Sequence, residues 1–117
     1  MECLHEDTAD GLRIIRLAGR MDIDGNEKVA LRFNTLTLAG GPAIIVDLSA
    51  LEFLCSLGIA TLISGAKTVN RRNGLFAFYG ASPNVQSALE RTNVTTLIPT
   101  CTTFEEARAR VTAASGN

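Results

Sequence analysis

The chain has 117 residues, of which 46% are hydrophobic and 20% are charged, and its formal net charge is -1. This length suits one domain with a real hydrophobic core, and the near-zero charge gives no electrostatic case for nucleic acid or an anionic membrane as partner. No apolar run approaches the roughly 20 residues of a membrane-spanning helix. The three cysteines lie far apart and form no pairs, which indicates a reducing cytoplasm and neither a disulfide framework nor a metal site.

The first third of the chain predicts a hairpin followed by a helix. Residues 3–6 and 12–17 are predicted as two strands that pair across a turn-rich segment. Asp24 followed three residues later by Glu27 resembles a capping box, so we expect a helix from there to the Gly-Gly-Pro stop at 40–42. Its apolar face is expected to comprise Val29, Leu31, Phe33, Leu36 and Leu38.

A buried strand, a loop and a second helix are predicted next. The apolar run 43–46 predicts the strand, and residues 47–55 are expected to form the loop. Ser56 then opens a segment with apolar residues at helical spacing, which we expect to end near Asn73, before Gly74. A serine therefore stands where the chain enters a helix, and serine is a preferred N-cap.

The remaining residues predict one more strand and two short helices. Residues 75–79 form the strand, and Ser82-Pro83 opens a helix with proline at its tolerated first position. The β-prone segment 94–98 is a short edge strand or a turn. One of the threonines at 102–103 is expected to cap the last helix, and residues 115–117 are expected to fray.

This order predicts an α/β domain. After the first hairpin, strands and helices alternate, which implies right-handed crossovers and a mostly parallel central sheet with an N-terminal antiparallel hairpin and about four helices. We expect one domain over residues 1–117, with a core from about 12 to 111 and mobile ends. In open α/β sheets, sites lie beyond the carboxyl ends of the strands, where the 47–55 segment and the start of the Ser56 helix are expected.

The sequence offers no recognisable catalytic machinery or cofactor motif. Its one histidine, His5, is close to a terminus, and no Gly-rich phosphate loop, HExxH motif or GxSxG elbow occurs. Cys55 beside a helix start could be a nucleophile, but no base partner is evident, so a packing role is favoured. We therefore expect a protein that is not an enzyme and needs no cofactor.

Ser56 admits two interpretations. A helix N-terminus has unpaired N–H groups and a partial positive charge, so a serine there can be phosphorylated without breaking the fold. The alternative is an ordinary helix cap. In the same way, Asp22, Asp24 and Asp47 are either caps and loop acceptors or an acidic cluster that engages the magnesium or the basic residues of a kinase.

Four segments of the chain resemble the STAS domain of bacterial anti-sigma-factor antagonists. They are residues 15–22, 45–49, 53–59 and 80–85. The resemblance extends from about Leu12 to Val111, and the 53–59 motif in its strand-loop-helix setting is the most specific part of it.

The resemblance implies an anti-sigma-factor antagonist that works in the cytoplasm by phosphorylation-dependent partner switching. In that family the serine aligned with Ser56 is phosphorylated by a serine kinase that is itself the anti-sigma factor. The unphosphorylated antagonist binds this partner and frees the sigma factor, and phosphorylation blocks the binding. Asp22 matches an acidic position near the serine, and Gly58 matches the glycine two residues beyond it. A PP2C-type phosphatase is a further implied partner, and we expect a monomer or a weak homodimer.

Two positions depart from the family pattern. The best-known members have Asp immediately before the serine, where this chain has Cys55, and often a second serine after it, where this chain has Leu57. The missing carboxylate weakens the case for efficient phosphorylation. A constitutive binder that is never phosphorylated therefore stays open, as does a STAS subunit of a lipid- or anion-transport complex or a signalling scaffold.

The expected partner-binding surface surrounds the serine. It comprises Asp22, Asp24, Leu54, Cys55, Ser56, Leu57 and Gly58. Leu54, Leu57 and Ile59 either form an exposed contact patch or belong to the core, and the core is favoured for Ile59. Gly58 costs up to about 1 kcal/mol relative to alanine inside a helix, so it either admits a close partner or packs tightly against the sheet.

Overall fold

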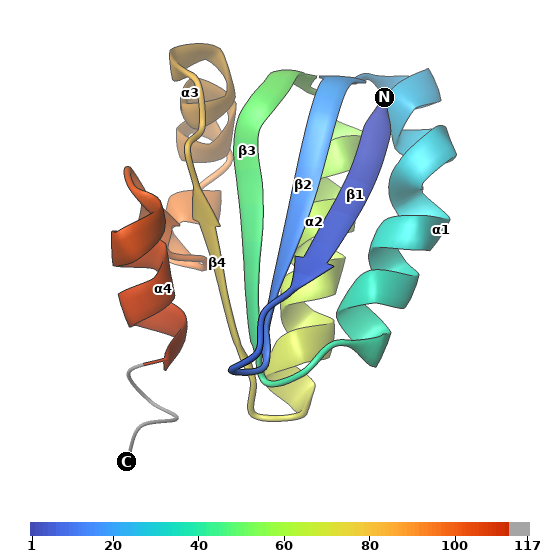
Figure 1. Cartoon of the computed structure of the whole chain (residues 1–117). Coiled ribbons are helices and arrows are strands. Elements are labelled where there is room, and N and C mark those ends of the chain that lie inside the picture. Colours follow the sequence, from blue (N-terminus) through green and yellow to red (C-terminus); the bar gives the residue numbers. More distant parts are fainter. Residues whose placement is uncertain (113–117) are drawn as a thin grey trace.

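The computed structural model describes residues 1–112 and has a five-stranded sheet at its centre (Figure 1). The elements in chain order are β1 (Glu2–Asp7), β2 (Leu12–Met21), α1 (Ile23–Ala39), β3 (Ala43–Leu54), α2 (Ser56–Arg71), β4 (Leu75–Tyr79), α3 (Pro83–Arg91), a 3-10 turn (Val94–Thr96), β5 (Thr100–Cys101) and α4 (Phe104–Thr112). The strands lie in the order β1-β2-β3-β4-β5. The β1–β2 pair is antiparallel and the other pairs are parallel, which confirms the predicted fold class.

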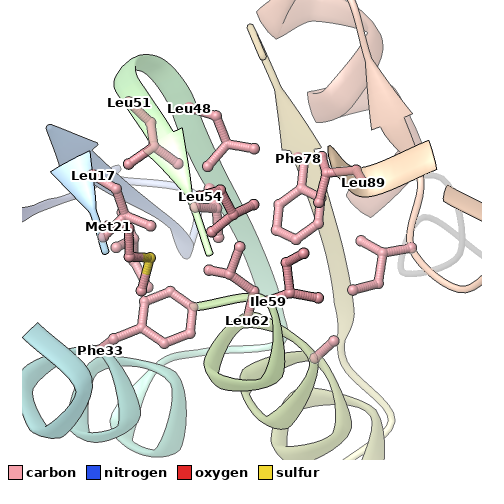
Figure 2. Packing of buried hydrophobic residues seen from close by; sticks show 14 of the residues in the cluster. Leu17, Met21, Phe33, Leu48, Leu51, Leu54, Ile59, Leu62, Phe78 and Leu89 are labelled. Atoms are coloured by element: carbon pink, nitrogen blue, oxygen red, sulfur yellow. The ribbon is translucent and has the colours of Figure 1, made fainter. Parts of the chain in front are cut away.

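Helices cover both faces of the sheet unequally. Side chains of α1, α2 and α3 share one large core with the strands, in which Phe33, Leu62 and Leu89 are fully buried (Figure 2). On the opposite face α4 packs against β3 and β4 and closes a smaller core with Ala107 and Val111. None of the described helices is long and apolar enough to cross a membrane.

The start and the apolar face of α1 differ from the sequence expectation. The N-cap is Asp22 and not Asp24, because the Oδ1 of Asp22 accepts a hydrogen bond from the N–H of Gly25 at 2.8 Å. Leu31 and Leu38 are 80% and 71% exposed, so their assignment to the buried face was wrong. Helical geometry explains the error, since the buried residues follow the i, i+4, i+7, i+8 rule and the two leucines fall on the opposite side. The buried side chains are Val29, Phe33, Leu36 and Thr37.

The predicted loop at 47–55 was also wrong, because β3 continues to Leu54. Arg16 pairs with Asp47 and Ala18 pairs with Ala50, so β3 uses one residue more than β2 over this stretch. A second shift between Gly19 and Arg20 adds one more residue to β3. These two β-bulges break the alternation of inward and outward residues that would have indicated a strand.

Asp47 stabilises the first bulge. Its Oδ1 accepts hydrogen bonds from the N–H and the hydroxyl of Ser49 at 2.9 and 2.6 Å. Its Oδ2 accepts one from the Tyr79 hydroxyl at 3.0 Å and lies 3.3 Å from the Nε of Arg16. Burial raises the pKa of the Asp47 carboxyl, but the hydrogen bonds from Ser49 and Tyr79 and the charge of Arg16 outweigh burial and hold this pKa below its ordinary value.

Asp47 therefore does not join an acidic cluster beside Ser56. Asp47 pairs with Arg16 of β2, whereas Leu54 at the end of β3 pairs with Met21. Arg16 and Met21 are five residues apart along β2. At 3.3 Å per residue, the separation along the sheet is about 16 Å.

The hairpin predicted at the start of the chain is present. Residues of β1 pair along their length with β2, from Glu2 opposite Ala18 to Asp7 opposite Arg13. Of the two alternatives for residues 94–98, a strand or a turn, the structure has the 3-10 turn, and the last strand is the short β5. The expected fraying of residues 115–117 lies outside the described residues.

Candidate functional site

Ser56 is the first residue of α2 and is exposed to solvent. The N-cap is Cys55, contrary to the expectation that the serine caps the helix. Cys55 has an extended backbone, and its Sγ accepts a hydrogen bond from the N–H of Gly58 at 3.5 Å. Within residues 1–112 the Ser56 hydroxyl has no hydrogen-bond partner. A substituent on this hydroxyl would thus leave the helix cap intact.

The ends of two neighbouring strands hold the serine in place. The N–H of Cys55 donates to the carbonyl of Met21 at 2.9 Å, which joins the end of β3 to the end of β2. The carbonyl of Cys55 then accepts the first hydrogen bond of α2, from Ile59 at 3.0 Å. The start of α2 is thereby fixed at the carboxyl edge of the sheet, where Asp22 also begins α1 (Figure 1).

Gly58 is buried against the two strand ends. A Cβ at this position would lie 2.9 Å from Cδ1 of Leu54 and 3.0 Å from Cγ of Met21. Both contacts are tighter than side chains normally tolerate, and both neighbours are buried in the core (Figure 2). This geometry supports the packing interpretation of Gly58.

The three apolar residues around Ser56 separate into core and surface. Leu54 is 5% exposed and Ile59 is buried as well, so their side chains serve the core. Leu57 is 51% exposed and stands beside the serine. Of the three, only Leu57 exposes much of its side chain to solvent.

A shallow depression joins Cys55 to the start of α1. Its lining includes Asp22, Ile23, Asp24 and Phe53. Ile23 is 60% exposed, and the guanidinium of Arg20 lies 4.6 Å from the centroid of the Phe53 ring. None of Ile23, Phe53 and Arg20 was predicted from the sequence as a site residue. Its position between two aspartates at a helix start could have indicated that Ile23 is exposed.

A second depression lies on the other side of the serine, between the start of α2 and the end of α3. Its lining includes Ser56, Ile59, Ala88, Arg91 and Thr92. The Cys55–Ser56 start of α2 therefore lies between a depression that contains Asp22 and Asp24 and one that contains Arg91. No sequence pattern connects Arg91 with Ser56, because 35 positions separate them and only the packing of α3 places both in one depression.

The site has no evident means of catalysis within the described part of the chain. The Cys55 thiol accepts one hydrogen bond, from a backbone N–H, and makes none to a carboxylate or with His5. His5 lies on β1 opposite Ile15, away from the strand ends that carry the serine. Among residues 1–112 no cluster of three His, Cys, Asp or Glu side chains could hold a metal ion.

Comparison with known proteins identifies the domain. A family model described as the STAS domain matches residues 6–107. The chain belongs to the STAS domain family. Among curated proteins none matches this STAS domain.

Solved structures share the fold of this STAS domain at low sequence identity. An anti-sigma factor antagonist from Mycobacterium paratuberculosis is 24% identical, with 94% of this chain and 92% of that chain covered and a TM-score of 0.84. The Bacillus cell fate determinant SpoIIAA in its phosphorylated form is 20% identical, with 93% and 98% covered and a TM-score of 0.69. A sulfate transporter family protein from Wolinella succinogenes is 15% identical, with 92% and 89% covered and a TM-score of 0.76. At these identities the likeness shows the fold.

Proposed function

We propose that this STAS domain is an anti-sigma-factor antagonist, which binds a serine-kinase anti-sigma factor while Ser56 is unphosphorylated. Phosphorylation of Ser56 by that kinase ends the binding, and a PP2C-type phosphatase restores it. The observation that carries the proposal is the free, exposed hydroxyl of Ser56 at the first position of α2. The domain acts in the cytoplasm, as a monomer or weak homodimer, and is not itself an enzyme.

The surface around Ser56 suits a protein partner. Ile23 and Leu57 are large apolar side chains that remain more than half exposed; Ile23 shares a depression with Cys55, and Leu57 follows Ser56 in α2. Asp22 and Asp24 add negative charge beside them and can interact with basic groups of the partner. Exposed apolar side chains within a polar rim are typical of protein interfaces.

Phosphate at Ser56 would oppose this contact without changing the fold. It adds about -1.5 to -2 charges at pH 7 in the middle of the apolar surface, where a partner would have to desolvate it. Cys55 caps α2, and Gly58 packs α2 against the ends of β2 and β3. Neither contact depends on the serine hydroxyl. The switch therefore acts by excluding the partner and not by reshaping the domain.

Intact-mass measurement with the cognate kinase and ATP tests the phosphorylation step. We expect one phosphate on the wild-type protein and none on Ser56→Ala. Ser64→Ala is the matched control, because Ser64 is an exposed serine on the same helix. Equal labelling of Ser56→Ala and wild type would refute Ser56 as the acceptor.

Binding measurements with the anti-sigma factor test the exclusion step. Ser56→Asp should weaken binding while thermal stability stays nearly unchanged. Leu57→Ser and Ile23→Ser should also weaken binding, whereas Leu31→Ser, the same kind of change at an exposed position on the outer face of α1, should not. Should Ser56→Asp bind as tightly as wild type, purified phosphoprotein decides, and tight binding by that form contradicts exclusion.

A second function is favoured by one comparison. The similarity to a sulfate transporter family protein fits a STAS subunit of an anion- or lipid-transport complex. Co-purification from the native cell separates the two proposals. Recovery of a permease and no serine kinase would favour transport.

A further inference from the structure

The depression between α2 and α3 brings one charged side chain to Ser56. Arg91, in the last turn of α3, is the only Asp, Glu, Lys or Arg in its lining. The chain of α3 is well anchored there, because Leu89 is fully buried and the side-chain amide of Asn84 donates to the carbonyl of Glu52 at 3.1 Å. The backbone that carries Arg91 is therefore held at a fixed place relative to β3 and the start of α2.

The guanidinium of Arg91 is available to a new partner. Within residues 1–112 no carboxylate lies within ion-pair distance of it, and its one hydrogen bond goes from Nη1 to the neutral hydroxyl of Ser87 at 2.7 Å. Arginine has five N–H donors in a planar fork that matches phosphate geometry, so four remain free here. Thr92 is less suited, because its hydroxyl already donates to backbone carbonyls of α3.

We propose that Arg91 binds the phosphate of phosphorylated Ser56 across this depression. The inference rests on the proposed phosphorylation of Ser56 and names the side chain that receives the product. A phosphoserine oxygen would accept charge-assisted hydrogen bonds from the free guanidinium nitrogens of Arg91, which lines the same depression as Ser56. The phosphate is then drawn toward α3 and away from Asp22 and Asp24, whose like charges repel it.

This arrangement has a consequence for the switch. The phosphorylated state gains a contact between α2 and α3 that the unphosphorylated state lacks, so removal of the phosphate must break it. A phosphatase should therefore act faster on a variant without the guanidinium.

A phosphorus NMR titration of the phosphorylated full chain tests the proposal. An opposite charge at hydrogen-bonding distance favours the dianion, so Arg91→Gln should move the midpoint of the 31P chemical-shift titration up by about one pH unit, the low end of such effects. Arg91→Lys, which keeps the charge but loses the fork, should give an intermediate midpoint. Lys67→Gln is the matched control, because it removes one charge from an exposed position farther along α2 and should leave the midpoint unchanged.

Three outcomes would overturn the role of Arg91. They are an unchanged midpoint in Arg91→Gln with normal anti-sigma-factor binding, an unchanged midpoint with weaker binding by unphosphorylated Arg91→Gln, and an equal change in Lys67→Gln. The second would assign Arg91 to the partner interface. Phosphoserine can be placed at position 56 by genetic encoding, so the titration does not depend on the cognate kinase. If the kinase leaves Ser56 unmodified while the encoded phosphoserine titrates as expected, the proposed function fails and the pairing with Arg91 stands.

Discussion

Replacement of Gly58 by alanine separates a packing role from an interface role. The new Cβ would lie 2.9 Å from Leu54 Cδ1, 3.0 Å from Met21 Cγ and 3.1 Å from Met21 Sδ. Overpacking of this kind costs about 1–3 kcal/mol, while alanine in place of glycine favours the helix by about 1 kcal/mol. Both neighbours are side-chain atoms that can move a few tenths of an ångström, so the cost falls near the middle of its range. We expect a net loss of about 1 kcal/mol, or about 4 °C in Tm for a domain of this size.

Thermal and urea unfolding followed by circular dichroism measure this loss, and two variants of the same helix calibrate it. Ala60→Gly at an exposed position reports the helix propensity alone and should cost about 1 kcal/mol. Gly65→Ala would place a Cβ 2.6 Å from Cε2 of the Phe33 ring, so it should be destabilised more than Gly58→Ala. Anti-sigma-factor binding by Gly58→Ala, corrected for the folded fraction, should equal that of wild type.

The opposite result would refute the packing role. If Gly58→Ala were as stable as wild type or more stable, yet bound its partner more weakly, the glycine would serve close approach of that partner. The tight contacts with Leu54 and Met21 would then be relieved by local movement at no cost.

Three further predictions follow from the caps, the buried carboxylate and the thiols. Asp22→Ala should lower the free energy of unfolding by about 1 kcal/mol because it removes the α1 cap, whereas Asp24→Ala, which removes no cap, should change it little. Equal losses in urea unfolding would contradict the cap assignment. Because the pKa of Asp47 is lowered by folding, its carboxylate contributes stability above the ordinary pKa of 3.8 that is lost as pH falls through the folded pKa, so Asp47→Asn should be less stable than wild type near pH 6 and the gap should narrow in acid. A constant gap in urea midpoints from pH 6 to pH 2 would contradict this. Under native conditions iodoacetamide should label Cys55 before the two buried cysteines, and the anti-sigma factor should slow that labelling; a rate unaffected by saturating partner, followed by mass spectrometry, would exclude Cys55 from the interface.

The order of strands and helices was predictable because each has a local signal. The apolar run of β4 and the Ser82-Pro83 start of α3 were both placed correctly. The cap of α1 was not, since Asp24 and Glu27 imitate a capping box while the true cap, Asp22, bonds to the N–H of a glycine. Which of two nearby aspartates caps a helix depends on where the preceding strand ends, and the sequence pattern does not contain that information.

The position of Ser56 at the start of a helix was predictable, and the residues that surround it in space were not. Ser56 and Leu57 were found from the strand-to-helix transition and the family motif, and both are exposed. Leu54 was assigned to the same surface because an apolar residue in a predicted loop suggests a contact with a partner protein. It is instead buried in the core. Arg91 lines the same depression as Ser56 through tertiary packing alone, which no local pattern reveals.

The two bulges make β3 two residues longer than the stretch of β2 with which it pairs. It uses 12 residues, from Ala43 to Leu54, to cover the span that β2 covers with 10, from Leu12 to Met21, and the first and last residues of the two strands are paired. Without the bulges the end of β3 would overshoot β2 by two residues, about 7 Å at 3.3 Å each. Related chains can therefore lose a residue at either bulge and still deliver the serine to the same point. No bulge lies between Leu54 and Ser56 to accommodate an added residue. We therefore expect the length of β3 to vary among relatives at its bulges, and the number of residues between its end and the serine to stay constant.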